Sequence, residues 1–369
     1  LFSRSPNPEE LRTKLLQKAS VKLQHFYNCC FEIQHTKKGL ANGENPYQAP
    51  AYLHITDDSV ALGMASLNPL SEQIPCYTNL ADLDCLLNLV IALAKSFVHH
   101  FGKAPHLAVA AKHGNACGCA ISWNSPMDAL EHALWGNAKG IWGGELVVNF
   151  EITPEIAQAM LRSSQREARY GNAAWMLDIV AAPAFTEKAG PMLTARKFRK
   201  VFSLPELAAP DKAHLLPAVR CVRGGQLEQP PHDFILQIPP NLGWNDTIKT
   251  DMILAWAISF WSFHGGNEVA IVKDSMLLGA AGGPSTVDSA NTAIDRARNS
   301  HCDSINGATF AANAFFPYTD APKALVDAGC SYGVVPEGGQ NFADVKKFFL
   351  ENHTNVFFLP PVIRGFNRH

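Results

Sequence analysis

The spacing of apolar residues predicts that helices and strands alternate along the chain. Apolar positions recur three or four residues apart in the segments 7–23, 80–101, 125–138, 153–164, 246–263 and 285–300, and again from about residue 321. Short apolar runs bounded by turn residues predict strands within the segments 107–113, 143–150, 176–185, 267–286, 308–318, 329–339 and 355–363. The run 107–111 is continuously apolar and ends in Lys112 and His113, which is typical of a buried strand in a parallel sheet. The order strand, helix, strand indicates an α/β fold whose sheet is covered by helices.

The same pattern restarts after a polar, proline-containing stretch, residues 186–245. In each half a long apolar helix precedes a strand that ends in Lys, in LAVAAKHGNACGCA (107–120) and in EVAIVKDSMLLGAA (268–281). The second copy has Asp274 where the first has His113. We interpret this as a duplicated unit, with chemistry in the first copy and supporting groups in the second. The predicted parts are an N-terminal helical segment (1–40), a first subdomain with the Lys-His pair (41–190), a connecting region (191–245) and a second subdomain (246–369).

The composition narrows the class of protein. With 369 residues, 47% of them hydrophobic and 17% charged, the chain is long enough for two domains or two halves of one domain. A net charge of -2 gives no basic field for nucleic acid, and no apolar run is long enough to predict a membrane span. Nine cysteines without a regular spacing predict free thiols. The first residues lack the features of a signal peptide, so we expect a cytoplasmic protein.

The residues Lys112 and His113 end the first predicted strand, and Cys117 and Cys119 follow them. His113 and the two cysteines are candidate zinc ligands, although the spacing of zinc deaminases, H-x-E followed by P-C-x-x-C, is absent. As an acid–base pair, the His113 imidazole is a candidate general base, and the Lys112 ammonium beside it is a candidate donor to a developing oxyanion. His113 can also be a histidine whose hydrogen bonds are satisfied near the core. The residues alone leave these alternatives open.

Several blocks, in the same order, resemble the transformylase domain of the bifunctional purine-biosynthesis enzymes, which formylates aminoimidazole carboxamide ribotide (AICAR). The blocks are GENPYQ (43–48), KHGNACGCA (112–120), WGGELVVN (142–149), LDIVAAP (177–183), GGNEVAIVK (265–273), TVDSANTA (286–293), NAFFPYTDAPKALVDAG (313–329) and IRGFNRH (363–369). The resemblance covers the chain from about residue 40 onward. It implies a stand-alone, divergent member without the cyclohydrolase domain of the family. The implied fold is a duplicated, cytidine-deaminase-like three-layer α/β/α unit with mixed sheets covered by helices.

The resemblance implies transfer of a formyl group from 10-formyltetrahydrofolate to a poorly nucleophilic aromatic amine. By this likeness His113 is the base that accepts the amine proton, and Lys112 is its electrostatic partner. Asn267 matches a residue that hydrogen-bonds at the formyl centre, although it is also a plausible turn residue after two glycines. No metal is required. The implied partners are a small amine, folate and a second copy of the chain, in a homodimer with sites at the interface; nucleic acid and membranes are not expected.

Binding residues follow from the same likeness. The amine would contact Asn42, Gly143, Asp178 and Arg364. The folate would contact Phe315, Phe316, Pro317, Asp320 and Gly338. Without the resemblance, Phe315 would be a core residue, Asp320 a helix cap and Arg364 a solvated side chain.

The chain departs from the family where anions are bound. The Arg and His of the family motif R-Y-G-x-N-P-H-Q are replaced by Ala41 and Tyr47. The Arg of G-A-G-Q-x-S-R is Thr286, in a loop one residue shorter, and the Arg of F-F-P-F-R-D is Thr319. We therefore expect a formyltransferase with retained chemistry and a changed acceptor. The alternatives are a genuine AICAR transformylase, a non-catalytic relative that binds folate or a metabolite, and a zinc hydrolase.

Overall fold

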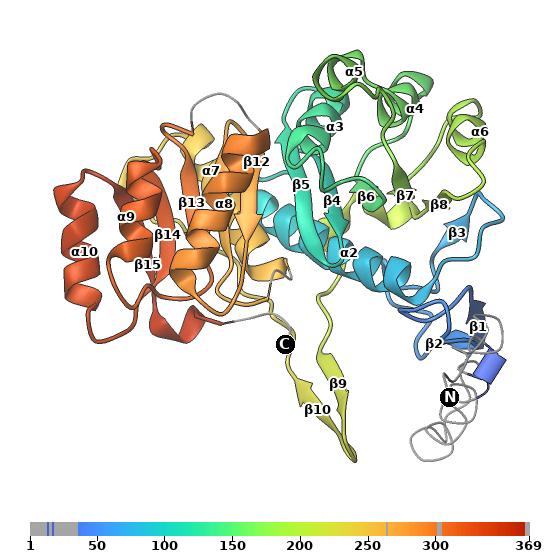
Figure 1. The fold of residues 1–369 in the computed structure, drawn as a ribbon, viewed down its shortest axis with the longest axis horizontal. Coiled ribbons are helices and arrows are strands. Elements are labelled where there is room, and N and C mark those ends of the chain that lie inside the picture. The colour runs from blue at the N-terminus through green and yellow to red at the C-terminus, as the bar shows by residue number, and fades with distance from the viewer. Residues whose placement is uncertain (1–12, 15–16, 18–35, 263–264, 301–304, 366–369) are drawn as a thin grey trace, which may run out of the picture.

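The computed structural model describes residues 13–14, 17, 36–262, 265–300 and 305–365. The expected N-terminal helix (7–23) falls almost wholly outside the described residues, as does the end of the last block, residues 366–369. In the described part, helices and strands alternate as expected, which confirms the α/β class (Figure 1). None of the helices in these ranges combines the length and the apolar character needed to cross a bilayer.

The elements fall into two halves with a connection between them. The first half contains α2 (Tyr77–Phe101), β4 (His106–Lys112), β5 (Asn115–Ser122), α3 (Pro126–Trp135), β6 (Gly144–Val148), α4 (Pro154–Leu161), α5 (Ser164–Tyr170), β7 (Leu177–Ala182), α6 (Ala189–Thr194) and β8 (Lys200–Ser203). The second half contains α7 (Asp246–Trp261), β11 (Val269–Lys273), β12 (Met276–Ala281), α8 (Thr286–Ser300), β13 (Thr309–Ala312), α9 (Asp320–Asp327), β14 (Tyr332–Pro336), α10 (Phe342–Glu351), β15 (Asn355–Leu359) and η4 (Pro361–Ile363).

The remaining elements precede or connect the halves. They are β1 (Thr36–Leu40), β2 (Ala51–Ile55), β3 (Asn68–Pro69), η1 (Pro205–Ala208), η2 (Pro210–Lys212), β9 (Ala218–Val222), β10 (Gly225–Gln229) and η3 (Pro240–Leu242). The β9–β10 hairpin is largely exposed and stands away from the sheet in Figure 1. Strand β8 pairs with β7, so the sheet of the first half reaches into the segment that the sequence assigns to the connection.

A single mixed sheet runs through both halves in the order β15-β14-β13-β11-β12-β5-β4-β6-β7-β8-β3. Outward from its centre, each half repeats the same directions. In the first half, β4 is antiparallel to both β5 and β6, and β7 is parallel to both β6 and β8. In the second half, β11 is likewise antiparallel to both β12 and β13, and β14 is parallel to both β13 and β15. The pairing therefore confirms the duplication that the sequence predicted.

The direction of β4 corrects one sequence expectation. Its apolar run predicted a parallel strand, but β4 is antiparallel to both β5 and β6. Helices cover both faces of the sheet here, so the five central side chains of the strand are buried whatever the direction of its neighbours. A continuous apolar run therefore indicates that both faces of the strand are buried, and it does not indicate whether the strand is parallel or antiparallel to its neighbours.

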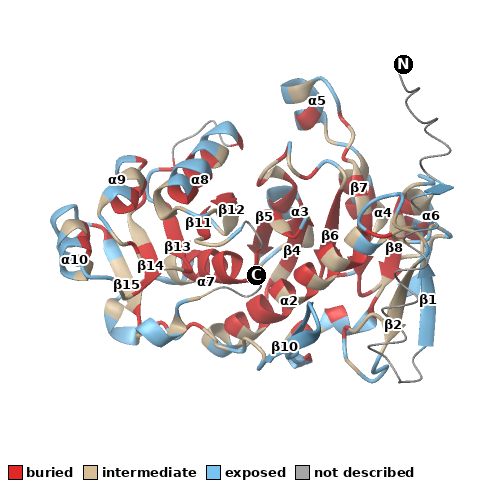
Figure 2. Cartoon of the chain, turned by 60° about the horizontal axis from the view of Figure 1, so that its bottom comes forward, coloured by how far each residue is buried: buried red, intermediate tan, exposed pale blue. Residues whose placement is uncertain are grey.

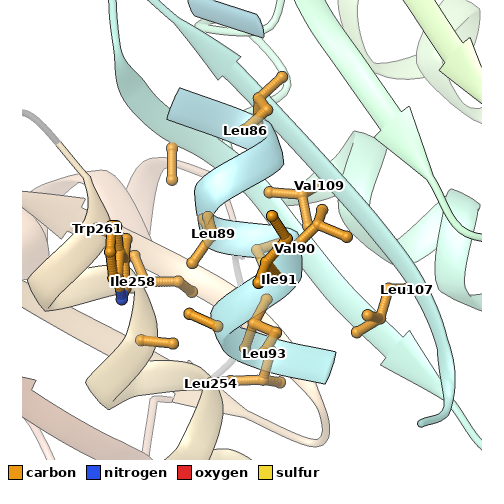
Figure 3. Close-up of a cluster of buried hydrophobic side chains, with 14 of the residues drawn as sticks. Leu86, Leu89, Val90, Ile91, Leu93, Leu107, Val109, Leu254, Ile258 and Trp261 are labelled. Atoms are coloured by element: carbon orange, nitrogen blue, oxygen red, sulfur yellow. The ribbon is translucent and has the colours of Figure 1, made fainter. Parts of the chain in front are cut away.

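The core is divided by the sheet into two faces (Figure 2). On one face α2 and α7 pack together over both halves, and Figure 3 shows Leu89 of α2 near Ile258 and Trp261 of α7. On the opposite face α3, α4 and α6 cover the first half, while α8, α9 and α10 cover the second. The paired helices α2 and α7 thus join the halves through one hydrophobic cluster.

The two central hairpins repeat each other in detail. Hairpins β4–β5 and β11–β12 each carry a register shift just before the Lys that ends the first strand. Opposite these shifts lie Gly118 and Gly279. A Cβ atom on Gly118 would lie 2.0 Å from the Ala133 carbonyl oxygen of α3, and one on Gly279 would lie 2.3 Å from the Ala293 carbonyl oxygen of α8. Both glycines therefore allow a helix to approach the strand closely.

We predict that Gly118→Ala lowers the free energy of unfolding by about 1–3 kcal/mol, because the added methyl group meets backbone and not a flexible side chain. Gly39→Ala is the matched control, since a Cβ there meets nothing within 4 Å. Denaturant titrations of the two variants check the prediction. Equal unfolding midpoints for the two variants would contradict the close approach of α3 to β5.

Candidate active site

The Lys-His pair lies at the tip of the β4–β5 hairpin. Strand β4 ends at Lys112, and the two loop residues His113 and Gly114 have φ of 55° and 71°. Left-handed backbone at both loop positions matches the twist of the flanking strands, as in a type I′ turn. It is uncommon for a residue other than Gly, Asn or Asp, so an interaction outside the loop must support His113. The turn leaves the His113 side chain exposed at the edge of the sheet.

That support comes from Asp82, a buried residue of α2. Its Oδ2 accepts a hydrogen bond of 2.7 Å from the His113 backbone N–H, and the carboxylate also accepts from the Gly114 N–H. The second half repeats the arrangement, because Asp251 of α7 accepts from the N–H groups of Asp274 at 3.1 Å and Ser275 at 2.7 Å. Asp82 and Asp251 are both the sixth residue of their helices. Sequence reasoning missed both, although an Asp at the same position in two apolar helices was the available signal.

A second buried acid, Glu145 of β6, lies against Asp82. Burial raises the pKa of Glu145 to about 9, and the charge of Asp82 adds to the rise. Glu145 is therefore protonated at neutral pH and donates a hydrogen bond to the Asp82 carboxylate, while its Oε1 accepts from Asn79 Nδ2 at 3.0 Å. Burial also raises the pKa of Asp82, and the turn N–H groups oppose that rise. The pair thus carries one negative charge, directed at the turn.

Of the four residues expected to contact the amine, Gly143 and Asp178 lie near this turn and Asn42 lies at the start of α2, whereas Arg364 lies beside Phe315 in the second half. Lys112 Nζ donates to the Trp142 carbonyl oxygen at 2.5 Å, and a Cβ on Gly143 would lie 3.7 Å from the same Nζ. Asp178 of β7 is half-buried, and its charge contributes to the raised pKa of Glu145. The expected residue Asn42 accepts from the Tyr77 N–H at 3.0 Å, at the start of α2. Asn42 therefore lies at the end of α2 that carries Asp82.

The cysteines after the turn are core residues. Cys117 packs on the α3 side of the sheet and Cys119 on the α2 side, because the register shift falls at Cys117. Burial raises the pKa of the Cys117 thiol to about 12 and raises that of Cys119 as well. These two cysteines and His113 do not converge, and no group of three His, Cys, Asp or Glu within the described ranges has a metal-binding arrangement.

The residues expected to contact folate gather in the second half, together with Asn267. A cavity of about 410 Å³ is lined by Asn267, Pro284, Ser285, Thr286, Val287, Ala314, Phe315, Pro317, Tyr318 and Asp320. Asn267 has φ of 45°, and its Nδ2 donates to the Gly283 carbonyl oxygen at 2.9 Å. A Cβ on Gly338 would lie 2.6 Å from the Phe315 ring, and the Arg364 guanidinium lies 5.6 Å from the ring centroid.

Phe316 is the exception in this group. Its side chain is buried in the core, where its ring lies near the rings of Phe310 and Phe349, and it does not line the cavity. Its neighbour Phe315 is half-buried and lines the cavity. Phe316 thus supports the cavity wall from the core side and presents no ring face to a ligand there.

The structure does not bring Lys112, His113 and Asn267 into one cavity within the chain. Lys112 and His113 line a separate cavity of about 210 Å³, and the described linings of the two cavities share no residue. Strands β5 and β12 are antiparallel neighbours, so the Lys-His tip and the end of β12 lie at the same edge of the sheet. Of the replaced arginine positions, Thr286 lines the second cavity and Ala41 is exposed beside the start of α2.

Protonation of Glu145 predicts a pH-dependent stability. Between its ordinary value of 4.5 and the raised pKa of about 9, the folded state binds a proton that the unfolded chain has released. Stability therefore falls as pH rises through this range, by at most about 1.4 kcal/mol per pH unit. We predict that Glu145→Gln, which keeps a donor toward Asp82 and cannot titrate, removes most of this fall.

Denaturant titrations from about pH 5 to about pH 9 measure the effect. The exposed residue Glu151, just beyond β6, provides the control variant Glu151→Gln, which should keep the wild-type dependence on pH. An unchanged pH dependence in Glu145→Gln would show that Glu145 is ionised in the folded protein.

Comparison with known proteins agrees with this architecture. The family model described as the AICARFT/IMPCHase bienzyme matches residues 9–296. The chain is 28% identical over 309 residues to the bifunctional purine biosynthesis protein PurH of Persephonella marina, covering 82% of this chain and 54% of that protein. It is 27% identical over 308 residues to PurH of Bacillus subtilis, with the same shares covered.

PurH of Caldicellulosiruptor saccharolyticus is 27% identical over 340 residues, which covers 90% of this chain and 60% of that protein. The chain thus spans about half the length of the curated relatives it matches. The family match includes the Lys-His hairpin, both supporting aspartates and the start of the second cavity. This chain belongs to the AICARFT/IMPCHase bienzyme family, and it matches the transformylase-like part of its relatives.

Proposed function

We propose that this protein is a folate-dependent N-formyltransferase, which moves the formyl group of 10-formyltetrahydrofolate to an aromatic or heteroaromatic amine. The observation that carries the proposal is the Lys-His hairpin, which presents an exposed imidazole on a turn held by a buried carboxylate. Membership of the AICARFT/IMPCHase family supports the reaction class. The acceptor is inferred from the residues that differ from the family pattern.

The chemistry follows from what the transfer requires. The amine nitrogen attacks the formyl carbon and loses a proton, which His113 accepts; a base positioned this way contributes about 10²–10⁴ in rate. The tetrahedral intermediate carries an oxyanion, and a fixed donor such as the Lys112 ammonium stabilises it by roughly 3–4 kcal/mol. The intermediate collapses by breaking the bond to the folate nitrogen, which takes up a proton. Formylated amine and tetrahydrofolate are released.

Folate is assigned to the second cavity. Its volume of about 410 Å³ falls within the usual range for small-molecule sites. Asn267 offers an amide near the formyl centre, Phe315 an aromatic wall and Asp320 an exposed carboxylate. Because this cavity and the Lys-His cavity are separate within one chain, we propose a homodimer in which the second cavity of one copy meets the Lys-His hairpin of the other.

The acceptor is proposed to differ from AICAR in its anionic group. A hydrogen bond to a charged group contributes roughly 1.5–3 kcal/mol. Loss of arginine at Ala41 and Thr286 would therefore weaken a ribose-phosphate by up to roughly 3–6 kcal/mol, or about 10²–10⁴-fold. The exposed Ala41 and the cavity residue Thr286 provide no charge in their place.

We predict that His113→Ala keeps folate binding but lowers formyl transfer by about 10²–10⁴-fold, because the amine proton then has no positioned acceptor. His132→Ala, at an exposed position of α3, is the control and should transfer at the wild-type rate. Tetrahydrofolate release measured by absorbance gives the rate, and calorimetry gives the folate affinity. Wild-type turnover by His113→Ala would remove this residue from the mechanism.

We also predict that AICAR is turned over no better than its unphosphorylated riboside and free base, each assayed with 10-formyltetrahydrofolate. The double variant Ala41→Arg with Thr286→Arg should raise the preference for AICAR over its riboside by at least about 10-fold. Rapid turnover of AICAR alone by the wild-type protein would instead identify a genuine AICAR transformylase. Folate binding without transfer to any amine would identify a non-catalytic relative.

A further inference from the structure

The seam between the two halves of the sheet opens toward the Lys-His turn. Strands β5 and β12 pair at Ala120 and Met276, with a further bond of 3.0 Å from the Ile121 N–H to the Ser275 carbonyl oxygen. At the other end, near Ala116, no ladder pairing joins β5 to β12 in the described chain. The cavity of about 210 Å³ lies at this opening. It is lined by Lys112, His113, Asn115, Ala116, Cys117, Gly136, Asn137, Gly140, Leu277, Leu278, Gly279, Ala280 and Arg296.

Groups from neighbouring elements satisfy the strand edges in this opening. The Ala116 N–H donates to Ser262 Oγ at 2.8 Å, at the end of α7. The Cys117 carbonyl oxygen accepts from the Asn137 N–H at 2.6 Å. The Ala280 carbonyl oxygen accepts from Arg296 Nη1 of α8 at 2.5 Å. The seam is therefore held open by specific contacts, and the cavity is part of the fold.

The charged side chains that line this cavity are all basic. Its lining contains three basic side chains, Lys112, His113 and Arg296, and no Asp or Glu. Burial lowers the pKa of Arg296, and none of the ion pairs within the described ranges includes it. Within the described residues, its hydrogen bond to Ala280 uses one of the five guanidinium N–H donors. A half-buried cation without a counter-charge is costly unless a ligand supplies one.

We propose that this cavity is an anion subsite of the formyl acceptor, in which Arg296 and Lys112 bind an oxyanion carried by the amine substrate. This inference rests on the proposed formyltransferase function. Because His113 lines the same small cavity, the oxyanion binds within a few ångströms of the reacting amine. The acceptor class is then a compact aromatic amine whose carboxylate or phosphate lies a few atoms from its nitrogen.

Calorimetric titration with inorganic phosphate and, separately, with acetate tests the subsite directly, at constant ionic strength and without folate. Wild-type protein should bind at least one of the two ions, and the preferred ion distinguishes a phosphate from a carboxylate. Arg296→Gln should weaken this binding by about 10-fold or more, while Arg296→Lys should retain it within about 3-fold. Arg298→Gln is the matched control, because Arg298 is an exposed arginine of the same helix and should bind as wild type.

Thermal unfolding of each variant checks that it folds. If Arg296→Gln does not fold, anion binding by Arg296→Lys is compared with that of the wild-type protein instead. Absence of binding by both ions, or equal losses in Arg296→Gln and Arg298→Gln, would overturn the subsite. Phosphate or acetate binding that depends on Arg296, in a protein that formylates no amine, would support the subsite and contradict the transferase. Formyl transfer with an unchanged KM in Arg296→Gln, and no anion binding, would contradict the subsite alone.

Discussion

The hydrogen bonds from two left-handed turn residues to the Asp82 carboxylate fix the position of His113, the proposed base. A His with positive φ is unfavourable by itself, and the turn keeps this conformation because both of its N–H groups point at one buried carboxylate. The same contact recurs at Asp251, where the turn residue is Asp274. The interaction therefore belongs to the duplicated fold, and the first copy carries an imidazole where the second carries a carboxylate. The carboxylate can remain charged in the core because its neighbour Glu145 is protonated.

Duplication also explains why the two groups of expected site residues lie apart. The first copy presents its hairpin tip at one edge of the sheet, while the second copy forms its cavity where Asn267 precedes β11 and Phe315 follows β13. Antiparallel pairing of β5 with β12 brings these features to the same edge without merging them. In the proposed mechanism, a second copy of the chain, or a ligand that spans both cavities, connects the proposed base with the proposed folate site.

Long apolar segments made most of the architecture predictable from sequence, because helices such as α2 and α7 are buried along their length. The direction of β4 was not predictable, since burial on both faces gives the same run in either direction. Adjacent residues of a chain leaving a strand face opposite sides, so only one of Phe315 and Phe316 can line the cavity, and the sequence does not say which. The role of a buried polar residue such as Glu145 could not be predicted, because it depends on the residues that the fold brings into contact with it. From the sequence, Arg296 is an ordinary charged residue of a helix, because only the structure shows that it lines the cavity between β5 and β12.

The acids near Lys112 explain how the site stays electropositive. Asp82, Glu145 and Asp178 would together neutralise the lysine if all were ionised and free to approach it. The charge of Asp82 is directed at the turn N–H groups, and Glu145 is neutral because burial and Asp82 raise its pKa. The ammonium donates to the neutral Trp142 carbonyl. Among the described residues no salt bridge includes Lys112 or Arg296, so the lysine charge is available for the oxyanion of the proposed intermediate, and Arg296 extends the same field into the seam. The buried proton on Glu145 thus sustains both the proposed catalysis and the proposed anion subsite.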